Sequence, residues 1–191
     1  MTFCACLQAL LPLAGCGEPA PEVAESEAQP AGAGLLPAYV PNAGCGEDGR
    51  VVTTLYGALP GEIEWAAGEM NCEGMPRPGG AGARLRFAGE AAPGVEIAII
   101  VAMPDLERGR VMSEVPSNVT VIEEGAGRFF STTDLETCWT DVDEQSPLDD
   151  AGTHRVDGTL YCIGPLAEVN GTASVSIEEL EFSGLLAWGS E

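Results

Sequence analysis

The sequence predicts an all-β protein, an antiparallel β-sandwich of the jelly-roll or immunoglobulin-like kind. Short runs of β-branched and aromatic residues follow one another along the chain, and in most of them apolar and polar residues alternate. Turn residues separate the runs, because 25 Gly and 14 Pro are spread over the 191 residues. No long stretch has the 3.6-residue period of an amphipathic helix. Together these observations favour stacked sheets over a helical or mixed fold.

The first four predicted strands have distinct patterns. Residues 51–56 are β-branched and aromatic and are followed by a glycine. Residues 62–65 alternate Glu with Ile and Trp, and residues 84–87 alternate Arg with Leu and Phe. Each of these two segments therefore predicts a strand with one buried face. Residues 95–102 are almost entirely apolar, which predicts a central strand covered on both faces.

The second half of the chain continues the series of strands. Further strands are predicted at 119–122, 128–132 and 156–163. Apolar residues alternate in one phase over 175–177 and in the other phase over 180–188, which indicates a β-bulge or bend between them. A short helix is expected around 104–108, the one segment where the pattern favours helix.

Four cysteines in the predicted domain indicate two disulfide bonds. Cys45, Cys72, Cys138 and Cys162 are widely spaced and even in number, as in domains that fold in an oxidising compartment. Four cysteines allow three pairings, and the sequence alone does not choose between them. We expect the sequence-local pairing, Cys45–Cys72 and Cys138–Cys162. A zinc site is disfavoured, because no C-x-x-C motif occurs and the chain has a single histidine.

The N-terminus has the features of an export signal that ends at a cysteine. Residues 3–14 are uncharged and largely apolar, and they are too few to cross a bilayer, which takes about 20 apolar residues. The run ends in Leu13-Ala14-Gly15-Cys16, and small residues before a single cysteine resemble the lipobox of bacterial lipoproteins. Unlike most such signals, this one has no Lys or Arg before the cysteine.

The resemblance to lipoproteins has consequences for the location of the protein. It implies cleavage before Cys16, acylation of the Cys16 thiol and attachment to a membrane through the acyl chains. In this family an Asp after the cysteine marks retention at the inner membrane. Gly17 and Glu18 follow Cys16 here, so the resemblance implies the outer membrane of the bacterial cell envelope.

The chain divides into three predicted parts. Residues 1–15 are the expected signal peptide. Residues 16–44 contain Cys16 and a tether rich in Pro, Ala and Glu, which buries too little apolar surface to fold. Residues 45–191 are enough for one sandwich domain with a hydrophobic core.

The charge of the chain excludes some classes of partner. The chain carries 30 Asp and Glu against eight basic residues, all of them arginine, for a net charge of −22. Binding to nucleic acid or docking on an anionic membrane face is therefore not expected. We interpret the charge as a solvated acidic surface, with capture of divalent cations as the alternative.

Motifs for catalysis and ligand binding are weak. The chain has no G-x-S-x-G motif, so we expect His154 to be a surface or strand-edge residue rather than a catalytic base. The Gly-rich segment 78–84 leads into a predicted strand and lacks the G-K-[ST] ending of a phosphate loop, so we expect a turn. Trp65, Trp139 and Trp188 are candidates for a sugar-binding platform, although packing in the core is the expected role.

The best candidate for a metal site is the acidic run 134–150. Calcium takes six to eight oxygen ligands, and a loop of this composition supplies them. The run is not an EF-hand, because no Gly follows Gln145. We expect a solvated loop without a bound metal. The acidic residues of the run are Asp134, Glu136, Asp141, Asp143, Glu144, Asp149 and Asp150.

These observations lead us to expect a non-catalytic binding or structural module at the bacterial cell envelope, with no cofactor. Its expected partners are the membrane, through the lipid on Cys16, and an envelope protein or glycan. Three alternatives stay open: a calcium-stabilised adhesion or glycan-binding module, an envelope hydrolase that uses carboxylates, and a carrier of apolar cargo between the sheets.

Overall fold

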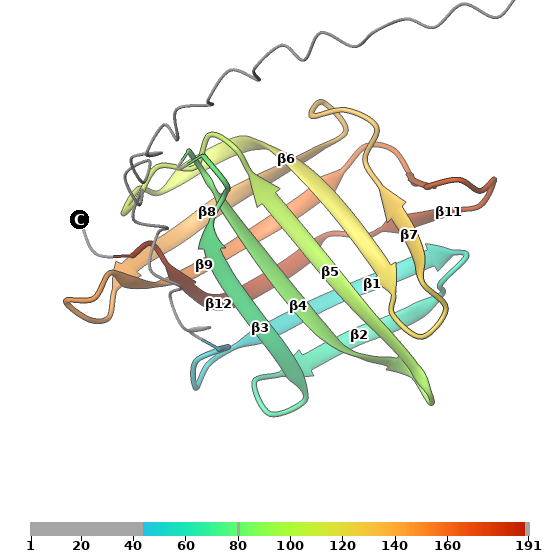
Figure 1. Ribbon diagram of the computed structural model, residues 1–191, viewed down its shortest axis with the longest axis horizontal. Helices are drawn as coiled ribbons and strands as arrows, with labels where there is room; N and C mark the ends of the chain where they lie inside the picture. The colour runs from blue at the N-terminus through green and yellow to red at the C-terminus, as the bar shows by residue number, and fades with distance from the viewer. Residues whose placement is uncertain (1–43, 80, 190–191) are drawn as a thin grey trace, which may run out of the picture. The chain divides into compact units, whose positions relative to one another are not determined.

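The computed structural model describes residues 44–79 and 81–189, and these fold as antiparallel β-strands without a helix (Figure 1). The predicted signal peptide, the tether and Cys16 lie outside the described residues. The strands are β1 (Arg50–Gly57), β2 (Gly61–Ala66), β3 (Met70–Pro76), β4 (Ala83–Ala92), β5 (Val95–Met103), β6 (Met112–Glu123), β7 (Arg128–Ser131), β8 (Cys138–Pro147), β9 (Thr153–Cys162), β10 (Leu166–Glu168), β11 (Ser174–Ile177) and β12 (Leu180–Ala187).

The strands form two layers whose directions cross (Figure 1). One layer has the order β3-β4-β5-β6-β7, and the other has the order β8-β9-β12-β1-β2. Their inward side chains meet in a single core, as in a sandwich. The predicted fold class, all-β and antiparallel with two disulfides, is confirmed.

Strand β6 belongs to both layers. Its first half pairs with β8, and its second half pairs with β5 and β7. At the crossing the hydroxyl groups of Ser117 and Thr140 are buried and lie 2.8 Å apart in a hydrogen bond, so these polar side chains are satisfied within the core. A second link runs through the pairings β7–β10, β10–β11 and β11–β1.

Two phenylalanines pack the centre of the core between the layers. The rings of Phe87 on β4 and Phe182 on β12 lie with their centroids 5.7 Å apart. Gly184 leaves the space that the Phe87 ring occupies, because a Cβ at this position would stand 3.0 Å from the ring. A side chain at position 184 would therefore push the two layers apart.

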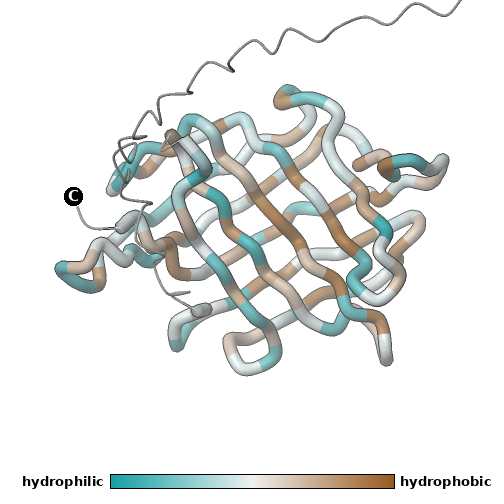
Figure 2. The backbone as a smooth tube through the Cα atoms, viewed as in Figure 1, coloured by the Kyte–Doolittle hydropathy of each residue, from teal (hydrophilic) through white to brown (hydrophobic). Residues whose placement is uncertain are grey.

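Among the described residues, strands cover only the inner face of β5, which corrects the expectation of protein layers on both faces. Figure 2 shows hydrophobic colour along much of β5. Its inward residues Ile97, Ile99 and Val101 face the second layer. On the outer face Ala98 is also fully buried. The ion pair between Arg86 and Glu124 reaches from β4 across β5, and the register places this ion pair above Ala98. The aliphatic part of the Arg86 side chain thus shields this position from solvent.

The predicted helix at 104–108 is wrong. These residues form turns, and Leu106 is the one among them whose side chain is buried. One buried side chain cannot offset the cost of nucleating a helical turn. The loop is instead fixed by Gln145 on β8, whose amide donates to the carbonyls of Glu107 and Arg110 and accepts from the backbone N–H of Gly109.

The predicted break near Glu178 is confirmed. Strands β11 and β12 pair with the same edge of β1, and residues 178–179 separate them. The carbonyl of Glu178 accepts a hydrogen bond from the Thr53 hydroxyl, and its N–H donates to the carbonyl of Thr54. The chain therefore stays attached to β1 while the alternation of its side chains shifts by one residue.

Both disulfides have the expected pairing, but they tie different parts of the fold. The Cys45–Cys72 bond joins the segment before β1 to β3, which belongs to the other layer. The Cys138–Cys162 bond joins residues that lie directly opposite each other on β8 and β9. The first bond therefore holds two layers together, and the second stabilises one hairpin.

We predict that reduction of the purified protein lowers its thermal stability strongly. The two bonds span 27 and 24 residues of sequence, so each is expected to contribute on the order of 3 kcal/mol through the unfolded state. Thermal unfolding followed by circular dichroism, with and without reductant, measures the effect. Thiol titration of the native protein is the control, and reactive Cys45, Cys72, Cys138 or Cys162 would contradict the prediction.

Candidate functional site

The outer face of the layer that contains β8, β9 and β12 brings together polar, charged and aromatic side chains. Register and burial place Trp139 beside Tyr161 in one row across these strands, and Asp141 beside Thr159 in the next row. The rows that follow contain Asp157 with Ser183 and Arg155 with Leu185. Two regions of this face are candidate sites: a charged groove and an aromatic pair.

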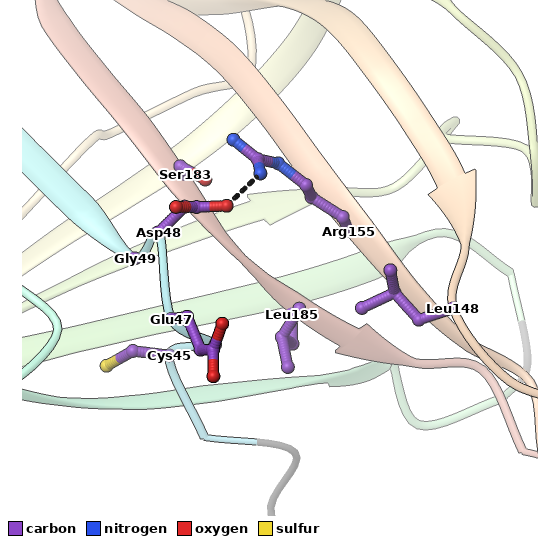
Figure 3. Close-up of a pocket in the computed structure, with 9 residues that line it drawn as sticks. Cys45, Glu47, Asp48, Gly49, Leu148, Arg155, Ser183 and Leu185 are labelled. Atoms are coloured by element: carbon purple, nitrogen blue, oxygen red, sulfur yellow. Dashed lines mark hydrogen bonds and ion pairs between the residues drawn. The ribbon is translucent and has the colours of Figure 1, made fainter.

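The charged groove consists of two adjoining hollows of about 200 and 390 Å³ that share Asp48, Arg155 and Ser183. Figure 3 shows the smaller hollow, where the Arg155 guanidinium reaches Asp48 and the side chains of Leu148 and Leu185 form an apolar floor. The Nη1 atom of Arg155 lies 2.6 Å from Oδ2 of Asp48, and its Nε atom lies 2.9 Å from Oδ2 of Asp157.

Both arginines that line the groove are paired with acidic residues, and the acidic residues outnumber them five to two. Hydrogen bonds to Asp157, and then the nearby charges of Asp157 and Asp48, raise the pKa of Arg155 above its usual range. At the other end of the groove Arg50 forms an ion pair with Glu181. Both arginines of the groove are thus occupied by carboxylates of the protein itself.

The aromatic pair lies at the β8–β9 end of the same face. Trp139 and Tyr161 are half-buried and directly opposite each other, with ring centroids 6.0 Å apart and an angle of 23° between the ring planes. The cross-strand disulfide is the neighbouring residue pair, so the position of the two rings relative to each other is fixed by the hairpin. Half-buried parallel rings can contact a ligand without a large change of structure.

Two carboxylates accompany the aromatic pair. Asp141 follows Trp139 on the same face of β8, and its Oδ1 accepts a hydrogen bond of 2.6 Å from the backbone N–H of Glu114. Glu114 has a φ of 53°, a left-handed conformation that is uncommon for this residue type. Burial, and then the charges of Asp141 and Glu114, raise the pKa of Tyr161. We call Trp139, Tyr161, Asp141 and Glu114 the aromatic–acid surface.

The three tryptophans do not form one platform. Trp65 is buried in the core, and its indole N–H donates to the carbonyl of Glu90. Trp188 is partly buried, and its indole N–H donates to Gln145. Trp139 alone stands on the candidate face. The expectation of core packing is therefore confirmed for Trp65. The ring beside Trp139 is that of Tyr161, which the sequence pattern does not indicate.

The acidic run 134–150 is not one loop, which corrects the expectation from sequence. Its centre is strand β8, so its side chains point in different directions. Asp134 closes a turn by accepting from Glu136 N–H and the Thr137 hydroxyl, and Asp149 accepts from Thr153 N–H. Within the described part of the chain, no group of three or more acidic, Cys or His residues is arranged to hold a metal ion.

We predict that sodium and calcium raise the melting temperature equally when they are matched for ionic strength. Screening of diffuse repulsion does not depend on the cation, whereas a calcium site would saturate at low concentration. Differential scanning fluorimetry with both salts measures this. A saturable rise specific to calcium, abolished by Asp141→Ala with Asp143→Ala, would contradict the prediction.

His154 is buried, which corrects the expectation of a surface residue. It lies on β9 with 6 % of its surface exposed, and its Nδ1 is buried without a hydrogen-bond partner among the described residues. Burial, and then the charge of Arg108, lower the pKa of His154, while Asp149 opposes this. No carboxylate orients the ring through Nδ1, so the described residues do not form a catalytic triad around it.

We predict that His154 makes the folded protein less stable as the pH falls below about 6.5. Because the folded state lowers the pKa of His154, the unfolded chain binds the proton more readily, and stability present above the unfolded pKa is lost in acid. Urea unfolding at pH 7.0 and pH 5.5 measures the change. The control is His154→Gln, for which the change should be smaller, and equal changes in the two proteins would refute the role of His154.

The Gly-rich segment forms a turn between β3 and β4, as expected. Arg77 N–H donates to the carbonyl of Gly82, and β4 begins at Ala83. Within residues 44–79 and 81–189, no helix has the length and apolar character to cross a bilayer.

Comparison with protein family models, with curated proteins and with solved structures found no match for this chain.

Proposed function

We propose that this protein is a lipid-anchored, non-catalytic binding module of the bacterial cell envelope. Cys16 carries the lipid, residues 17–44 form the tether, and the sandwich domain presents its outer face to a partner. The outer membrane is the proposed location, as the resemblance to lipoproteins implies.

The observation that carries the proposal is the pair of sequence-local disulfides in the described domain. Disulfides persist in compartments outside the reducing cytosol, and a lipobox directs a chain to such a compartment. The folded domain and the N-terminal segment, which share no residues, thus support the same location.

Three described carboxyl groups are poor candidates for the acid of a glycosidase. A glycosidase needs one carboxyl that keeps its proton near neutral pH, which requires a raised pKa. Hydrogen bonds lower the pKa values of Asp134 and Asp149, and hydrogen bonding to Arg128 lowers that of Glu168.

The packing between the layers bears on the alternative of an apolar carrier. The side chains of Phe87 and Phe182 meet at the centre of the core, where cargo would have to bind. A carrier would have to displace these rings, so we do not favour this function.

Glycan binding is the second candidate function. Trp139 and Tyr161 are half-buried and parallel, and an aromatic face of this kind packs against the apolar face of a sugar ring. A titration with a neutral oligosaccharide tests this candidate function.

We predict that Cys16→Ser releases the protein from membranes, because burial of acyl chains is the proposed attachment. Membranes are separated from soluble material after a high-salt wash, and the protein is detected by immunoblot. Cys6→Ser is the matched control, since it changes a cysteine of the proposed signal peptide and should leave the protein with the membrane. Retention of the Cys16→Ser variant in the washed membrane would refute the lipid anchor.

A further inference from the structure

The aromatic–acid surface combines two aromatic rings with two carboxylate side chains. The rings come from neighbouring strands, β8 and β9. Asp141 is held in place by its hydrogen bond to the Glu114 backbone, and Glu114 is exposed. Ionised carboxylates accept hydrogen bonds and donate none. A ligand that complements the two carboxylates therefore carries positive charge or hydrogen-bond donors.

The negative charge of this surface is not matched by the arginines of the described domain. Arg155 is paired with Asp48 and Asp157, and Arg50 is paired with Glu181. Among residues 44–79 and 81–189, no arginine forms an ion pair with Asp141 or Glu114. The charge that raises the pKa of Tyr161 is thus available to an outside cation.

The two rings distinguish between kinds of cation. A small, strongly hydrated ion gains little from an aromatic face and finds carboxylates everywhere on this acidic protein. A weakly hydrated organic cation gains from both features, because the faces of Trp and Tyr attract it and its alkyl groups pack against the rings. Trp is the strongest of the aromatic side chains in this interaction.

We propose that the aromatic–acid surface is a binding site for an organic cation of the alkylated ammonium class. Trp139 and Tyr161 contact its alkyl groups, and Asp141 and Glu114 balance its charge. The site rests on the proposed function as a binding module and names the class of its ligand.

The test is an NMR titration of the purified full-length protein with tetramethylammonium chloride. The chain has three tryptophans, so the indole N–H groups give three signals. Trp65 and Trp188 use their indole N–H groups inside the protein and serve as internal references for the fold. We expect a saturable shift of the Trp139 signal with tetramethylammonium, and none with sodium chloride at the same ionic strength.

Two pairs of substitutions separate specific binding from general attraction. Asp141→Asn with Glu114→Gln removes both charges and keeps an oxygen for the Glu114 N–H, and we expect it to raise the half-saturation concentration about fivefold. The matched control is Glu62→Gln with Glu64→Gln, which removes the same charge from β2 and should change half-saturation less than twofold. Trp139→Leu, read from the Tyr161 ring signals, should abolish saturation.

Three outcomes would overturn the proposed cation site. They are a Trp139 shift that follows ionic strength alone, equal effects of the two charge-removing pairs, and saturation by a neutral oligosaccharide but not by tetramethylammonium. The last result would support the glycan-binding function instead. Failure of the cation site leaves the membrane fractionation of Cys16→Ser unaffected, so the two proposals fail separately.

Discussion

The register of the β8–β9 hairpin determines what the outer face of the protein presents. Cys138 lies opposite Cys162, and this places Trp139 opposite Tyr161 and Asp141 opposite Thr159. A shift of one residue would turn the aromatic rings into the core and the inward side chains to solvent. The disulfide makes such a shift impossible without breaking a covalent bond. The candidate surface therefore depends on a crosslink that is not itself part of the surface.

Several parts of the fold could be predicted from sequence because their two faces differ sharply in polarity. Strands β2 and β4 alternate charged residues with large apolar residues, and the structure buries the apolar ones. Strand β8 could not be predicted, for the opposite reason. Two of its inward residues, Thr140 and Gln145, are polar, and they are satisfied by partners from β6 and the 104–111 loop that no local pattern reveals. Burial of polar side chains depends on distant partners, so periodicity does not detect it.

Part of the candidate site could be predicted from the sequence. The expected pairing of Cys138 with Cys162 already implies that Trp139 and Tyr161 face each other, since both are the next residues inward along a hairpin. The contribution of Glu114 was not predictable, because its left-handed backbone and its bond to Asp141 arise where β6 changes its pairing between layers. The burial of His154 was not predictable, because Arg108 and Gly109, which lie near its ring, come from a loop remote in sequence.

The ion pair above Ala98 has a consequence for the protein before it is folded. Residues 95–102 combine high β-propensity with a single charge, a composition that promotes self-association between extended chains. In the native state the segment is protected on one side by the core and on the other by Arg86 and Glu124. An unfolded chain has neither protection. Early formation of the β4–β5 hairpin, which brings Arg86 beside this segment, would thus reduce self-association of the unfolded chain.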